Sequence, residues 1–152
     1  MFLRIFGLSD RNPAPALLIE SLHAAGVAVV PHFRGDDLGW TSGELHFPGG
    51  GSPVTLERYL TAEDDLRDDL NTFAAELETM DFSPNSPELM RHVIQTKQLI
   101  TVRRPVDHAD EAALETVLQA SCRHLAQATE GIYQIDGQGW FTADGQLLLQ
   151  EY

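Results

Sequence analysis

The final segment of the chain reads Gly131-Ile-Tyr-Gln-Ile-Asp-Gly-Gln-Gly-Trp-Phe-Thr-Ala-Asp-Gly-Gln-Leu-Leu-Leu-Gln-Glu-Tyr152. Asp136-Gly137 and Asp144-Gly145 are strong turn pairs, because both residue types accept the backbone angles that tight turns require. Apolar, β-prone runs at 132–135, 140–141 and 147–149 flank these pairs. The segment therefore predicts a β-meander.

The residues before this meander predict a long helix over 110–128, which Asp107 or Asp110 caps and Gly131 ends. Further upstream, apolar periodicity and breaker residues predict the remaining elements. The expected helices cover 13–26, 61–80 and 86–97, and the expected strands cover 2–6, 27–33, 44–47, 54–59 and 98–103. We expect the first strand–helix–strand unit to place two parallel strands side by side. The stretch 34–53 is rich in glycine and turn residues and is expected to be mainly loop.

The resulting order is β-α-β-β-β-α-α-β-α-β-β, which combines local hairpins with one or two crossovers. This order predicts a single α+β domain over residues 1–152, with a mostly antiparallel sheet and helices packed on one face. The first choice of architecture is a ferredoxin-like core with additions.

Two stretches of the C-terminal half carry a resemblance to other proteins. They are Ser86–Pro105, which includes His92-Val-Ile-Gln-Thr-Lys-Gln-Leu-Ile-Thr-Val, and the ending Ala128–Gly145. They resemble a family of small bacterial α+β proteins that has no established activity. The resemblance implies a bacterial cytoplasmic origin and adds no reaction, because the shared motifs are turns and strands.

Composition narrows the classes of partner. The chain has 152 residues and a formal charge of −13, which repels phosphate backbones and anionic lipid surfaces, so neither nucleic acid nor membrane is an expected partner. The sequence contains one cysteine, Cys122, and nothing at its start resembles a signal peptide, so a reducing cytoplasm is expected. No nucleotide-binding or catalytic signature is present, and no cofactor is expected.

Acidic residues concentrate on the expected 61–80 helix and its approach, with Asp64, Asp65, Asp68 and Asp69 at their centre. Such a surface favours a non-enzymatic protein-binding or regulatory module, adaptor-like or immunity-like, that takes a basic partner. A homodimer is the alternative, in which the acidic surface meets a basic patch formed by Arg91, Lys97, Arg103 and Arg104.

A second hypothesis is a metal-assisted hydrolytic enzyme. Its candidate metal ligands are imidazoles and carboxylates within one short stretch: His32, Asp36, Asp37, Glu44 and His46. The hypothesis requires the strand end and the loop to converge. A third is a small-ligand pocket lined by Trp40, Tyr59 and Trp140. Cys122 lies on the apolar stripe of its helix and is expected to be a core thiol, not a nucleophile.

Overall fold

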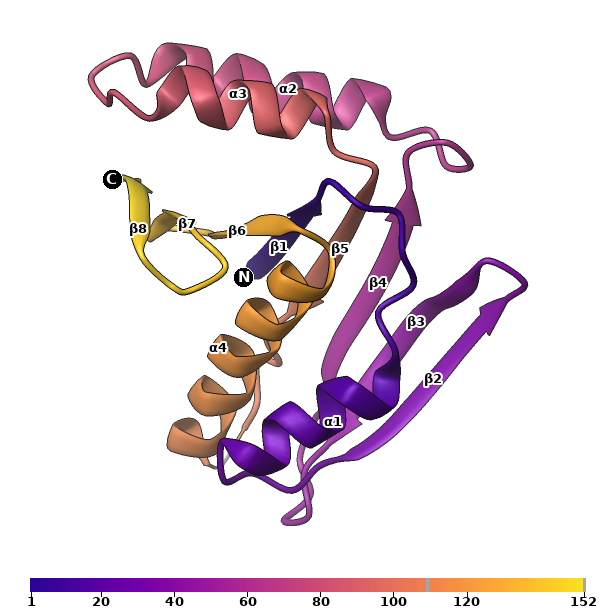
Figure 1. Ribbon diagram of the computed structural model, residues 1–152. Helices are drawn as coiled ribbons and strands as arrows, with labels where there is room; N and C mark the ends of the chain where they lie inside the picture. The colour runs from indigo at the N-terminus through magenta and orange to yellow at the C-terminus, as the bar shows by residue number, and fades with distance from the viewer. Residues whose placement is uncertain (109, 152) are drawn as a thin grey trace.

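The computed structural model describes residues 1–108 and 110–151, so Tyr152 of the final segment lies outside the described residues. Its eight strands form one antiparallel sheet in the order β2-β3-β4-β5-β1-β6-β7-β8 (Figure 1). The strands are β1 (Phe2–Gly7), β2 (Val30–Asp36), β3 (Gly39–His46), β4 (Val54–Leu60), β5 (Gln98–Arg103), β6 (Gly131–Ile135), β7 (Gly139–Phe141) and β8 (Leu147–Gln150). The helices are α1 (Pro15–Ala24), α2 (Arg67–Thr79), α3 (Ser86–Ile94) and α4 (Glu111–Ala128).

The expected α+β class is confirmed, and its centre is a ferredoxin-like core. Elements β1-α1-β4-β5-α4-β6 follow the β-α-β-β-α-β order, and their strands are neighbours in the order β4-β5-β1-β6. The additions are the β2–β3 hairpin at one edge, β7 and β8 at the other, and the α2–α3 pair between β4 and β5. The expected parallel pairing of the first two strands is wrong, because β1 pairs antiparallel with β5 and β6 while β2 pairs with β3.

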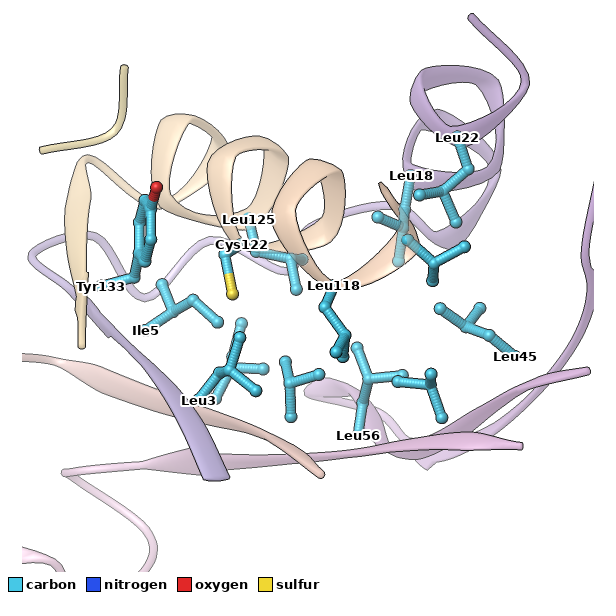
Figure 2. Packing of buried hydrophobic residues seen from close by; sticks show 14 of the residues in the cluster. Leu3, Ile5, Leu18, Leu22, Leu45, Leu56, Leu118, Cys122, Leu125 and Tyr133 are labelled. Atoms are coloured by element: carbon cyan, nitrogen blue, oxygen red, sulfur yellow. The ribbon is translucent and has the colours of Figure 1, made fainter. Parts of the chain in front are cut away.

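Helices α1 and α4 cover one face of the sheet (Figure 1). Figure 2 shows Leu118 and Cys122 of α4 pointing toward Leu3 and Ile5 of β1, within a continuous apolar cluster. The Cys122 thiol is fully buried, and this burial raises its pKa above the usual range. The expectation of a core thiol is confirmed.

The expectation that the helices pack on one face is wrong, because α2 and α3 form a second cluster on the opposite face. Successive residues of a strand point to opposite sides, so β1 presents apolar side chains to both faces. Thus Ile5 faces α4, whereas its neighbour Phe6 packs against Phe73 of α2 and Trp140 of β7, with ring centroids 5.3 and 5.0 Å away. The α2–α3 pair lies across one end of the sheet (Figure 1). Within the part of the chain that the structure describes, the rest of this face carries no helix.

Several boundaries differ from the sequence-based expectation, and local contacts explain two of the differences. Helix α2 begins at Arg67, not at Thr61, because the Asp64 carboxylate accepts a hydrogen bond from Leu60 N at 2.8 Å and closes a turn. The stretch 34–53, expected as loop, is largely a hairpin in which Asp36 Oδ1 accepts from Leu38 N at 2.9 Å. Pairing of β3 with both β2 and β4 extends a strand that local glycine content obscured.

The predicted β-meander is confirmed by the pairing of β6 with β7 and of β7 with β8. Gly137 has a φ of 78°, the left-handed conformation that the predicted Asp-Gly turn requires. Across residues 1–108 and 110–151, no helix has the length and apolar content needed to cross a membrane.

Candidate functional site

A hollow of the described surface lies where several connections meet at one end of the sheet. They are the β1–α1 loop, the β2–β3 turn, the β4–α2 connection and the α3–β5 connection. Two hydrogen bonds fix its floor: Thr61 N donates to Lys97 O at 2.9 Å, and Lys97 N donates to Gly7 O at 2.8 Å. The hollow is therefore built on backbone that the sheet itself orders.

Arg58 of β4 holds the walls of this region together. Its side chain is 5% exposed and donates from Nε to Gln98 Oε1 at 2.8 Å, from Nη1 to the carbonyls of Leu38 and Trp40 at 3.1 Å each, and from Nη2 to Asp10 O at 3.2 Å. Burial lowers the pKa of Arg58, and nearby carboxylates act against that shift. One buried cation thus joins the β1–α1 loop to the β2–β3 turn.

Gln98 and Trp40 complete the attachment of the β1–α1 loop. Gln98 Nε2 donates to Ser9 O at 2.5 Å and to Arg11 O at 2.8 Å, while Trp40 Nε1 donates to Pro13 O at 2.8 Å. Gly39 has a φ of 111°, and a Cβ there would lie 2.4 Å from Asn12 Oδ1 and 2.9 Å from Arg58 Nη1. The turn and the loop therefore pack too closely for any other residue at this position.

We call the hollow where these connections meet the end groove. It has a volume of about 880 Å³, within the range typical of ligand sites. Apolar side chains form much of its lining, and Leu38 and Ile94 are 51% and 46% exposed there. The apolar members are Leu8, Leu38, Leu60, Ala62 and Ile94, and the charged members are Asp10, Glu63, Arg67 and Lys97.

A smaller hollow of about 310 Å³, which we call the acidic hollow, adjoins the end groove through Leu38, Leu60 and Glu63. Its carboxylates are Asp36, Glu57, Glu63 and Asp64. Tyr59 also lines it and donates its hydroxyl to Glu57, an interaction that raises the pKa of Tyr59 to about 12. Arg58 lies in the wall of the hollow but forms no ion pair with any described residue.

The predicted acidic surface lies beside these two hollows. Asp64 and Asp65 belong to the β4–α2 connection, and Asp68 and Asp69 form part of the first turn of α2. All four are exposed, and none makes an ion pair within residues 1–108 and 110–151. Their negative charge is therefore directed to solvent.

The structure does not bring the five candidate metal ligands together. The rings of His32 and His46 lie 4.9 Å apart, and His46 Nε2 is 3.5 Å from Glu44 Oε1. Asp36 and Asp37 lie at the far end of the same hairpin. At the usual rise of a strand, Asp36 is about 13 Å from His32 along β2. Among the described residues, no three His, Cys, Asp or Glu side chains are arranged to hold a metal ion.

The basic patch expected for a homodimer is also divided. Lys97 immediately precedes β5 and Arg103 ends it, so the two lie about 20 Å apart along the strand direction. Arg91 pairs with Glu88 at 3.1 Å, and Arg104 pairs with two acidic residues of α4. The four cations therefore form no continuous surface opposite the acidic one.

The aromatic residues proposed for a small-ligand pocket lie in different places. Trp40 belongs to the apolar cluster under α1 and α4, and Trp140 belongs to the cluster under α2 and α3. Both indole rings are buried, at 5% and 2% exposed. Tyr59 lines the acidic hollow, where its hydroxyl donates to Glu57.

One polar contact that sequence reasoning missed resembles a nucleophile and base. Ser21 Oγ of α1 lies 2.7 Å from His124 Nδ1 of α4, and burial lowers the pKa of His124. Both residues lie inside helices, where backbone N–H groups bond within the helix and leave no donors for an oxyanion. The pair is best explained as a helix–helix contact.

Arg58 and Gln98 were also missed by sequence reasoning. The available signal was a charged residue at an inward position of a strand, in step with the apolar Val54 and Leu56.

Comparison with known proteins finds no matching family model, no similar curated protein and no similar solved structure. Function is therefore inferred from the geometry and charge of the chain itself.

Proposed function

We propose that this chain is a non-enzymatic protein-binding module, adaptor-like or immunity-like, that takes a basic partner through Asp64, Asp65, Asp68 and Asp69. The observation that carries the proposal is the exposure of four carboxylates with no ion-pair partner in the described chain. They occupy consecutive turns next to the ordered end of the sheet.

A net charge of −13 gives the molecule a negative field that draws basic partners toward it. A concentrated surface charge then directs the encounter to one place and raises the association rate, which falls as salt is added. We expect the partner to be bound and not chemically altered. We expect binding in the cytoplasm, because the single cysteine of the chain is buried and free, as is usual in a reducing compartment.

The test replaces the four carboxylates by amides in Asp64→Asn, Asp65→Asn, Asp68→Asn and Asp69→Asn together. Asparagine keeps an oxygen that can accept the hydrogen bond from Leu60 N, so the start of α2 should be retained. Immobilised variant and wild-type protein are compared for capture of basic proteins from bacterial lysate, at low and at high salt.

The matched control removes the same charge from exposed sites elsewhere. It carries Glu20→Gln, Asp107→Asn, Glu130→Gln and Asp144→Asn, so both variants have a formal charge of −13 + 4 = −9. We expect the first variant to lose a captured protein that the control keeps. Equal capture by both variants would show that the location of the charge does not matter, and the proposal would fail.

A further inference from the structure

The end groove and the acidic hollow are neighbours, because Leu38, Leu60 and Glu63 line both. We call the two together the depression. We infer that this depression binds an extended segment of the partner in which arginine or lysine stands next to a large apolar residue. The inference rests on the proposed function and adds the recognised sequence type and the place where it binds.

The apolar half has the properties of an anchor site. Leu38 and Ile94 present half-exposed apolar side chains to an 880 Å³ hollow. The hydrogen bonds that hold these two residues in place involve only their backbone carbonyls. Leu38 O accepts from Arg58, and Ile94 O accepts from Arg67 at 2.9 Å. These side chains are thus free to be covered by an apolar residue of the segment, which removes their surface from water.

The acidic half supplies the charge complementarity. Four carboxylates line a hollow of about 310 Å³, and the guanidinium of Arg58 in its wall is committed to Gln98 and to backbone carbonyls. A partner cation is the group that these carboxylates lack. Glu63 lines both halves, so the cation and the apolar residue must be close neighbours in the segment.

The depression also has a direction. Arg67 and Lys97 line the end groove, whereas they do not line the acidic hollow. The N–H groups of these two side chains can donate to the carbonyl oxygens of an extended segment. Their positive charges repel a second cation in the end groove. The arginine or lysine of the segment is therefore placed in the acidic hollow, and its apolar neighbour is placed in the end groove.

The test is an NMR titration of ¹⁵N-labelled protein with three synthetic peptides. The first is Ac-Gly-Arg-Arg-Leu-Trp-Gly-NH₂; the second replaces both arginines by glutamine, and the third replaces Leu-Trp by Ala-Ala. We expect saturable shifts of the amides of Leu38, Leu60, Glu63 and Ile94 with the first peptide. Each altered peptide should bind roughly tenfold more weakly, since it loses either the charge or the buried apolar surface.

Two variants on exposed side chains provide the matched protein control. Leu38→Ser with Ile94→Ser should weaken binding of the first peptide, whereas Leu17→Ser, an equally exposed site at 54% on α1, should leave binding unchanged. Unchanged binding of the first peptide by the double variant Leu38→Ser with Ile94→Ser would overturn the inference.

Other outcomes separate the inference from the proposed function. Shifts confined to 64–69 that persist with the Ala-Ala peptide would support the acidic surface but overturn the groove. Equal binding of the glutamine peptide would identify an apolar ligand site instead. Shifts that change with protein concentration alone would identify a second copy of the chain as the occupant. No shifts with any peptide would overturn the inference, and lysate capture would still decide the proposed function.

Discussion

Replacing Arg58 by methionine tests whether the buried guanidinium holds the loops around the end groove. Methionine keeps a long, unbranched side chain but has no N–H donor. The change leaves Gln98 Oε1 and the carbonyls of Asp10, Leu38 and Trp40 without their donor.

The magnitude follows from two opposing contributions. A buried acceptor without a partner costs about 1–3 kcal/mol, so the two buried acceptors, Gln98 Oε1 and Trp40 O, give a loss of roughly 2–6 kcal/mol. The partly buried carbonyls of Leu38 and Asp10 add a smaller loss, because water can reach them. Removing the buried charge recovers a desolvation penalty of several kcal/mol. The net loss in the free energy of unfolding should therefore be about 3 kcal/mol.

The assay combines urea unfolding, followed by far-ultraviolet circular dichroism, with amide hydrogen exchange. Exchange should accelerate in residues 8–13 and 37–40 while the amides of β1 and β5 keep their relative protection. Gln98→Leu serves in a double-mutant cycle, because Gln98 Oε1 is absent in the double variant. The two losses should then sum to more than the double variant shows, by about 1–2 kcal/mol.

A loss below about 1 kcal/mol with unchanged exchange in the β1–α1 loop would refute this reasoning. Strict additivity of Arg58→Met and Gln98→Leu would do the same, since it would mean that the two side chains stabilise the loops independently.

Three further predictions concern titration, thiol reactivity and metal binding. Burial lowers the pKa of both His92 and His124, so the unfolded chain binds more protons than the folded chain at pH values below the ordinary histidine pKa of 6.5. The free energy of unfolding should therefore fall as the pH drops below 6.5. The double variant His92→Asn with His124→Asn should show a smaller fall in urea titrations between about pH 7 and 5. The Cys122 thiol should not react with Ellman's reagent in the native protein but should react fully in urea, and rapid native reaction would contradict its burial. Calorimetric titration of metal-stripped protein with zinc should give no saturable heat, and a site lost in His32→Ala with His46→Ala would revive the metal hypothesis.

The meander was predicted because Asp136-Gly137 and Asp144-Gly145 specify their turns locally. The β2–β3 hairpin was largely missed, because its turn at 37–38 contains no such pair and its strands depend on pairing with β4. The start of α2 was placed too early, because Thr61 and Asp64 resemble a capping pair whose partners are in fact Thr96 O and Leu60 N.

The sequence by itself determined the α+β class, the C-terminal meander, the negative charge and the core position of Cys122, because periodicity, turn pairs and composition are local properties. Only the tertiary structure decided that β1 lies between β5 and β6, that Arg58 reaches Gln98 and Leu38, and that the candidate metal ligands are divided along one hairpin. These features join residues far apart in the chain, and the strand register that brings them together arises from packing of the whole sheet against its helices.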